Sequence, residues 1–180
     1  YVNLTVPQLE QLTALITKAW ANIPPMAENF KTIADKAKTM AIGEKYQDIE
    51  LMNPEGEMVK LSSCVPEGKY VMLEFWASWC GPCRGEIPHL KHVYQNYKDK
   101  GFEIISVSID QKNKDWQKAM KEEKMPWIQL NDPQGENGPA IQVYNVTGVP
   151  HCILLDKEGK IFKTNMRGAY LDAALEQLIP

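Results

Sequence analysis

The first 41 residues carry apolar side chains every three or four positions, which is the spacing of an amphipathic helix. One such series covers 9–20, and Thr5 stands before it as a candidate N-cap. Pro24-Pro25 is expected to end this helix, and a second series follows at 26–40. We therefore predict a helical extension at 1–41, whose two helices pack on the main domain or are the end of an upstream one.

From residue 42 onward, short apolar runs typical of buried strands alternate with helical periodicity. The runs predict two short strands within 46–62, around a turn at 53–56, and further strands at 69–77, 102–110, 126–130, 151–156 and 160–165. Helices are predicted at 83–101, 113–124, 139–146 and 171–179. This alternation indicates an α/β domain at 42–180, with a mostly parallel central sheet covered on both faces and an antiparallel hairpin at its end.

Composition and charge limit the possible functions. The chain has 180 residues, of which 44% are hydrophobic and 24% charged, as in an ordinary globular domain. Its net charge of −3 gives no electrostatic reason to expect nucleic acid as a partner. No apolar run approaches the roughly 18 residues that span a bilayer. Because the sequence opens at Tyr1 rather than Met, we expect a mature form or a fragment from which an address was removed.

Two of the four cysteines, Cys80 and Cys83, are separated only by Gly81-Pro82, between a predicted strand and a predicted helix. The ends of parallel strands are where α/β sheets place their sites. The unpaired N–H groups and the dipole of a helix start stabilise a thiolate, so a nucleophilic sulfur is expected here. Cys80 is the better candidate, because it stands at the entrance to the turn and Cys83 lies within the helix. Pro82 restricts the backbone between them.

Two structural interpretations compete with a reactive pair. A disulfide staple stabilises most when it closes a long loop, and this pair closes a very small one. A structural zinc site needs four ligands, whereas Cys64 and Cys152 are isolated in the sequence and the histidines stand at 89, 92 and 151. We therefore favour the reactive pair and predict no metal site.

The segment MLEFWASWCGPC at 72–83 resembles the active-site segment of thioredoxins, whose motif is CGPC. The longer run 75–110 and the segment GVPHCILLDKEGKI at 148–161 resemble the TlpA/ResA-like thiol-disulfide oxidoreductases of the AhpC/TSA-redoxin superfamily, particularly those of Bacteroidetes. The likeness covers about 42–180 and does not explain 1–41. It implies a thioredoxin-like fold, which is a central mixed sheet flanked by helices, here with an N-terminal β-hairpin.

The resemblance also assigns roles outside the motif. Val149-Pro150 matches the family's cis-proline element, which lies against the cysteines and offers backbone hydrogen bonds to a bound polypeptide; an ordinary turn proline is the alternative. Glu74 matches a buried acid that relays a proton to the second cysteine. Its apolar neighbours independently predict burial and a raised pKa. A salt bridge from Glu74 to Lys69 or Lys163 is the competing interpretation.

Glu86 lies three residues after Cys83, so the two side chains share a face of the predicted helix. ResA-like proteins have a Glu here that tunes the cysteines, although any acid near a helix start also favours the dipole. Trp79 is expected to form an apolar contact surface for substrate, together with Gly81 and Pro82, and Trp76 to support the core. Other residues are interpreted structurally: Arg84, His89 and His92 as solvent-facing on the helix, Cys152 as an inert core thiol and Cys64 as a lone residue of a loop or short helix.

Together these residues predict a thiol-disulfide oxidoreductase that reduces protein disulfides through Cys80 and Cys83, with no cofactor beyond their redox-active disulfide. The resemblance implies a periplasmic or cell-envelope location, with an anchor in a removed N-terminal segment. It also implies a membrane thiol donor as the reducing partner and a role in cytochrome c maturation. Residues 111–138 correspond to an insertion of this branch, which is expected to shape partner choice.

Two other classes of function stay open. A thiol-dependent peroxidase of the same superfamily would carry a P-x-x-x-T-x-x-C segment, and the corresponding residues here, WASWCGPC, have no such Thr. A copper- or other metal-binding thioredoxin-like chaperone could use Cys80, Cys83 and His151 as three ligands. Chaperones of that kind, however, use C-x-x-x-C and a differently placed His.

Overall fold

The computed structural model describes residues 3–180, so the first two residues of the predicted extension lie outside the described part. The extension forms helices α1 (Val6–Ala19) and α2 (Pro24–Lys38), which confirms both helical series. The Thr5 N–H donates to Gln8 Oε1 at 2.9 Å and so caps the start of α1. The expectation that Pro24-Pro25 ends the first helix is wrong. These prolines open α2, because a first helical turn needs no N–H and their fixed φ suits it.

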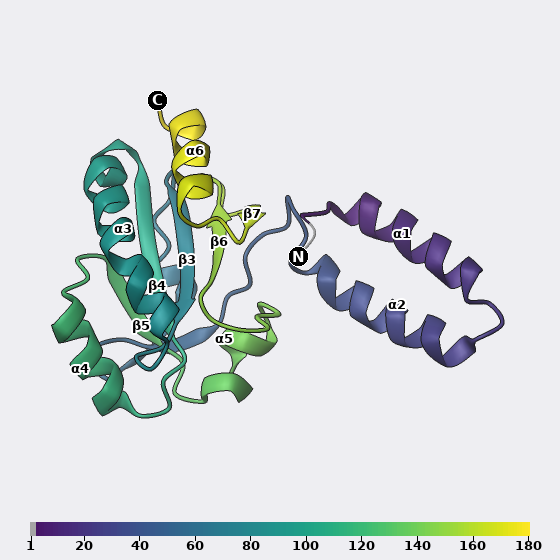
Figure 1. Ribbon diagram of the computed structural model, residues 1–180, viewed down its shortest axis with the longest axis horizontal. Helices are drawn as coiled ribbons and strands as arrows, with labels where there is room; N and C mark the ends of the chain where they lie inside the picture. The colour runs from purple at the N-terminus through teal and green to yellow at the C-terminus, as the bar shows by residue number, and fades with distance from the viewer. Residues whose placement is uncertain (1–2) are drawn as a thin grey trace.

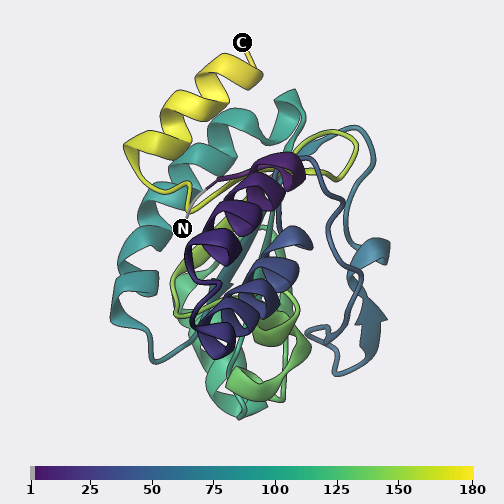
Figure 2. The ribbon, with the colours of Figure 1, turned by 90° about the vertical axis from the view of Figure 1, so that its right-hand side faces the viewer.

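The two helices form an arm that packs mainly on itself. Trp20 and Phe30 meet edge to face across it, with ring centroids 6.0 Å apart. Figure 1 shows the arm projecting from the rest of the chain, and in Figure 2 it faces the viewer. Near the domain, the Ile42 N–H donates to the Leu4 carbonyl at 2.9 Å, and Thr164 N–H donates to Asn3 Oδ1 at the same distance. Packing of the arm on the domain is therefore confined to its base.

The central sheet has seven strands in the order β2-β1-β5-β4-β3-β6-β7. Their bounds are β1 (Glu50–Met52), β2 (Met58–Lys60), β3 (Tyr70–Trp76), β4 (Phe102–Ser108), β5 (Ile128–Asn131), β6 (His151–Leu155) and β7 (Ile161–Thr164). Only the pairs β3–β4 and β4–β5 are parallel, and the others are antiparallel. The mixed sheet of a thioredoxin-like fold is thus confirmed, whereas the mostly parallel sheet predicted from alternation is wrong, because hairpins flank a parallel core of three strands.

Helices cover both faces of the sheet. Helices α3 (Gly81–Tyr97) and α6 (Ala169–Leu178) lie side by side on one face (Figures 1 and 2), where their apolar residues pack on Met72 and Ile104. Helices α4 (Asn113–Glu123) and α5 (Pro139–Gln142) pack on the other, against Leu73 and Phe75. Short 3₁₀ helices occur at Leu61–Ser63, Lys98–Lys100 and Gly135–Asn137. In the part of the chain described, no helix is both long and apolar enough to cross a membrane.

The strand register determines which side chains surround the site. Since β3 and β4 are parallel, their carboxyl ends meet at Trp76 and Ser108. Successive strand residues point to opposite faces, so Glu74 shares the face of Met72, under α3 and α6. Its register partners are Ser106 on β4 and Cys152 on β6. The cysteine motif follows directly at the end of β3.

Candidate active site

Cys80 and Cys83 form a disulfide at the start of α3, with their Cα atoms 5.3 Å apart. Helix α3 begins at Gly81 rather than at Cys83, and Cys80 is its N-cap, with Gly81 and Pro82 in the first turn. The Cys83 N–H donates to Cys80 Sγ at 3.2 Å, which is the N-cap contact that favours a negative sulfur. Both cysteines are buried, but Cys80 keeps 5% of its surface exposed and Cys83 none. The more accessible sulfur is therefore the one expected to attack.

The surface beside Cys80 presents Trp79, which is 63% exposed, whereas Trp76 is fully buried in the core. Two cavities of about 350 and 500 Å³ share Trp79, Ile109 and Glu136 as walls and form one groove. The remaining walls come from 110–115 and from 137–149. The ends of the predicted insertion, 111–138, thus line the groove beside Trp79, the residue before Cys80.

The Val149–Pro150 peptide bond is cis, directly before β6. Val149 lines the same groove as Trp79, so the loop before β6 and the residue before Cys80 face a common space. The predicted roles of Trp79 and Val149-Pro150 in binding substrate stay predictions.

A buried carboxylate fixes the loop that carries Trp79. Asp110, 3% exposed, lies just beyond the end of β4. Its Oδ2 accepts the Ser78 N–H at 2.8 Å and its Oδ1 accepts the Ser78 hydroxyl at 2.6 Å. The Ser108 hydroxyl also donates to Asp110 Oδ2, at 2.7 Å. Sequence reasoning missed this tether; the only signal was an acid that follows an apolar strand.

Glu74 is buried within the sheet, as its apolar neighbours predicted, with 3% of its surface exposed. The Ser106 hydroxyl donates to Glu74 Oε2 at 2.6 Å and accepts the indole N–H of Trp127 at 2.8 Å. Burial raises the pKa of Glu74 to about 7, the Ser106 hydrogen bond opposes this, and the charge of Glu86 adds to it. Glu74 can therefore exchange a proton near neutral pH.

The competing interpretation of Glu74 as an ion-pair partner does not hold for either lysine. Lys69 lies 3.9 Å from Glu103 Oε2, and the Lys163 ammonium stands over the Phe162 ring. Lys69 precedes β3 and Lys163 is exposed on β7, whereas Glu74 is buried in the core. Its hydroxyl partner leaves the carboxyl group free to hold a proton.

Two helix residues predicted to lie at the surface also connect elements. Arg84 donates from Nε to Glu123 at 2.6 Å and from Nη2 to Glu122 at 2.9 Å, which ties α3 to α4. His89 Nδ1 lies 3.1 Å from Glu86 Oε1, and its Nε2 lies 3.0 Å from an α6 carboxylate. Both side chains stay partly exposed on the helix, as predicted, but their contacts with α4 and α6 were missed because those partners are distant in sequence. His92 is exposed, and its Nε2 lies 3.1 Å from Nδ2 of its helix neighbour Asn96.

Glu86, three residues after Cys83, also makes a hydrogen bond that joins α3 to α6. Its Oε1 accepts the Gly168 N–H at the start of α6, at 3.0 Å, as well as facing His89. Its charge also acts on Cys152, whose pKa is raised to about 12 mainly by burial. Cys152 is a buried thiol that donates to the Met166 carbonyl at 2.8 Å, and Cys64 is a partly buried thiol after the Leu61–Ser63 helix.

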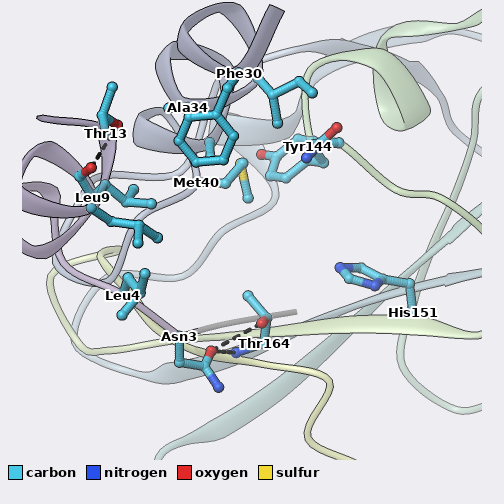
Figure 3. A pocket seen from close by; sticks show the side chains of 14 residues that line it. Asn3, Leu4, Leu9, Thr13, Phe30, Ala34, Met40, Tyr144, His151 and Thr164 are labelled. Atoms are coloured by element: carbon cyan, nitrogen blue, oxygen red, sulfur yellow. Dashed lines mark hydrogen bonds between the residues drawn. The ribbon is translucent and has the colours of Figure 1, made fainter. Parts of the chain in front are cut away.

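His151 lines a cleft of about 280 Å³ between the arm and the domain. Figure 3 shows His151 and Tyr144 on the domain side of this cleft and Leu4, Leu9 and Phe30 on the arm side. Burial, and secondarily the charge of Arg167, lower the pKa of His151 to about 4. Within residues 3–180, no three His, Cys, Asp or Glu side chains are arranged to hold a metal ion, so the Cys80–Cys83–His151 set is not assembled.

Comparison with known proteins is consistent with this geometry. The profile of the AhpC/TSA family matches residues 42–164. The chain belongs to this family. It is 31% identical over 144 residues to the thiol-disulfide oxidoreductase ResA of Bacillus thuringiensis subsp. konkukian, with 80% of each protein covered.

Solved structures agree with the family assignment. The thioredoxin domain of a thiol-disulfide oxidoreductase from Bacteroides vulgatus is 36% identical, with a TM-score of 0.70 over 78% of this chain and 99% of that one. A thiol:disulfide interchange protein from Bacteroides sp. is also 36% identical, with a TM-score of 0.70 over 78% of this chain and 91% of that one. The fold is thioredoxin-like, and the protein is a thiol-disulfide oxidoreductase with Cys80–Cys83 as its redox-active disulfide.

Proposed function

We propose that the protein reduces disulfides of other proteins, with Cys80 as the attacking sulfur and Cys83 as the resolving one. The observation that carries this assignment is the position of Cys80. It is the N-cap of α3, it is the more exposed of the two sulfurs, and it directly follows Trp79, which lines the groove together with Val149. Cys83 lies behind it, fully buried.

The reaction proceeds in two exchanges from the dithiol form. The Cys80 thiolate attacks one sulfur of the substrate disulfide, forms a mixed disulfide and releases the other substrate sulfur as a thiolate. The Cys83 thiolate then attacks Cys80 Sγ, which forms the Cys80–Cys83 disulfide and releases the second substrate sulfur. Two electrons pass from the protein to the substrate, and a reducing partner restores the dithiol.

Glu74 supports the second exchange, because Cys83 must lose its proton in a site closed to water. A carboxyl group with a pKa of about 7 can accept that proton and return it near neutral pH. Ser106 and Trp127 hold the group in one orientation. Glu86, three residues after Cys83, supplies a negative charge that opposes thiolate formation at the same helix start. We therefore propose that Glu74 and Glu86 together determine how fast Cys83 attacks the mixed disulfide.

The direction, location and partners follow from the resemblance to TlpA/ResA-like proteins. We propose a reductase of the periplasm or cell envelope, recharged by a membrane thiol donor and serving cytochrome c maturation. A redox titration against glutathione or dithiothreitol tests the direction. A reductase should have a potential near the roughly −270 mV of thioredoxin, and a value near the roughly −120 mV of DsbA would exclude this direction.

Trapping identifies the substrates. The Cys83→Ser variant cannot resolve the first exchange, so it should accumulate mixed disulfides on Cys80 when expressed in a bacterial envelope. Mass spectrometry of the trapped species names them, and apocytochrome c should be among them. The matched controls are Cys80→Ser, which should trap nothing, and Cys64→Ser, which should behave as the unmodified protein. Peroxide turnover that survives Cys83→Ser would favour a peroxidase instead.

A further inference from the structure

The larger cavity of the groove beside Trp79 contains a single charged side chain. The walls of this cavity, about 500 Å³ in volume, are Trp79, Ile109, Glu136, Ile141 and the loop 146–149. Among these described residues, Glu136 is the only acidic or basic one, and it is exposed. Glu136 also lines the smaller cavity, together with Trp79 and Ile109. It therefore stands where the two halves of the groove meet.

The protein does not neutralise the Glu136 carboxylate. Within residues 3–180, none of the ion pairs includes Glu136. The hydrogen bond that it accepts from Gln142 reaches its backbone carbonyl, not its side chain. The other walls of the larger cavity are uncharged and mostly apolar, and apolar surroundings weaken the screening of a charge by water. The groove thus presents a negative charge that a bound molecule can pair.

The loop that carries Glu136 is held in one shape. Gly135 has a φ of +62°, a value that favours glycine. Gly138 packs directly against the Asp132 carboxylate, where an added Cβ would collide. The same carboxylate accepts the Ala140 N–H at 2.8 Å. Because the backbone on both sides of Glu136 is fixed, little ordering of the loop opposes binding at this position.

We propose that Glu136 is a specificity-determining residue, which pairs with a Lys or Arg side chain next to the disulfide of a protein substrate. The proposal rests on the proposed function, because it needs a polypeptide disulfide that Cys80 attacks. Cys80 directly follows Trp79, so a mixed disulfide on Cys80 brings the flanking substrate residues toward the cavity that Trp79 and Glu136 share. The exposed indole of Trp79 also attracts a cation over its face, and the apolar stem of Lys or Arg packs against such a ring.

Three further charged residues line only the smaller cavity. The Asp110 carboxylate is buried and already accepts hydrogen bonds from the loop of Trp79. Lys112 and Asp115 are exposed and carry opposite charges, so their effects on a substrate charge largely offset each other. The preference of the groove for a cation therefore depends on Glu136.

Three synthetic peptides, each with one internal disulfide, test this preference. They differ only in the residue beside each cysteine, which is Lys, Gln or Glu, and which precedes the cysteine in one series and follows it in another. Each peptide reacts with an excess of the dithiol protein at low ionic strength. Two electrons pass from Cys80 and Cys83 to the peptide, which becomes a dithiol while the protein disulfide forms, and chromatography of quenched samples gives the rate.

Every peptide rate is divided by the rate with bis(2-hydroxyethyl) disulfide, a small uncharged reagent that needs little of the groove. This ratio removes any change in the reactivity of the Cys80 thiolate itself. In at least one series, the Lys peptide should react about threefold to fivefold faster than the Gln peptide, which is the size expected for one exposed ion pair, and the Glu peptide should be slowest. High salt should weaken the preference.

Substitutions then assign the preference to one carboxylate. Glu136→Gln should abolish most of it, Glu136→Lys should reverse it in favour of the Glu peptide, and Glu136→Asp should retain it in part. The matched control is Glu28→Gln, which removes the same charge from an exposed position on the arm and should leave the preference unchanged.

Equal rates for the three peptides in both series of the unmodified protein would overturn the proposal without any variant. A preference for the Lys peptide that persists in folded Glu136→Gln would overturn it as well. Failure of the unmodified protein to reduce any of the peptides would instead refute the proposed function, and that result does not depend on Glu136.

Discussion

The rim of the active site (Trp79, Cys80 and Val149) and its interior (Glu74, Ser106 and Trp127) are built for opposite conditions. At the rim, Trp79 is 63% exposed beside an open groove. In the interior, Glu74 is 3% exposed and depends on one hydroxyl group for its hydrogen bond. Attack on a protein disulfide needs access, whereas a proton acceptor with a raised pKa needs water kept out. The disulfide joins Cys80 at the rim to the fully buried Cys83, and we assign each cysteine a different step.

Substitution of single cysteines should give the largest loss of activity. Cys80→Ser replaces the attacking thiolate by a weak nucleophile and is expected to lower insulin reduction by on the order of a thousandfold or more. Cys83→Ser should also stop turnover but keep a single attack on Ellman's reagent, with release of one aromatic thiolate. Equal single-attack activity in both variants would contradict the division between rim and interior.

In the interior, Glu74→Gln tests whether the carboxyl group is protonated in the fold. Its pKa is about 7 when folded and near 4.5 when unfolded, so the folded state binds more protons between these values and stability falls as pH rises through them. Relative to the unmodified protein, Glu74→Gln should therefore gain stability from pH 4 to pH 8, by up to about 3 kcal/mol.

Urea unfolding at the two pH values measures this gain. His151, with its pKa lowered to about 4, imposes the opposite slope, because protonation of the unfolded chain below its ordinary value destabilises the fold. The His151 slope is the same in Glu74→Gln and in the unmodified protein, so it cancels in the difference between their unfolding free energies. A difference in unfolding free energy that does not change with pH would mean that Glu74 has the same pKa in the folded and unfolded states, which would contradict its raised pKa.

Weakening the hydrogen bonds between Asp110 and Ser78, which tether the loop of Trp79, should have an intermediate effect on stability and activity. Asp110→Asn keeps the shape but weakens the acceptor for the Ser78 N–H and hydroxyl, so it should cost about 1–3 kcal/mol in unfolding free energy. Because the tether holds the loop of Trp79, kcat/KM for insulin should fall as well. Asp115→Asn, an exposed acid near the same groove, is the control for charge. A loss of stability with unchanged kcat/KM would separate the tether from function.

Trp79→Ala should have the smallest effect on the fold and a selective effect on function. The side chain is exposed, so the unfolding free energy should change by less than about 0.5 kcal/mol. Loss of its apolar surface should raise KM for insulin about fivefold to tenfold, with kcat less affected. Ellman's reagent, which needs little of the groove, should react at nearly the original rate. An equal loss with both reagents would contradict a docking role.

The rim and the interior also differ in how much of their structure could be predicted from the sequence. The burial of Glu74 followed from its apolar neighbours on one strand, and the cysteine pair from its place between a strand and a helix. Asp110 could not be paired with Ser78 in this way, because 32 residues separate them. The same holds for His89 and Asp172, which are 83 residues apart. Local periodicity predicts elements, but contacts between elements depend on the order in which strands join the sheet.

The start of α3 shows a second limit of sequence reasoning. Helical periodicity becomes visible only after Cys83, yet the helix begins at Gly81, because an N-cap sulfur and a first-turn proline carry no hydrophobic pattern. The arm shows the reverse case. Its helices were evident from spacing, whereas their packing on each other rather than on the domain was not.

The difference between Cys80 and Cys83 can be measured directly in the reduced protein. Brief alkylation with iodoacetamide over a range of pH, followed by peptide mass spectrometry, gives the rate for each sulfur. Cys80 should react first and already at low pH, because it is accessible and caps a helix, and Cys83 should lag until higher pH. Faster alkylation of Cys83, or one common pH profile for both sulfurs, would contradict the account.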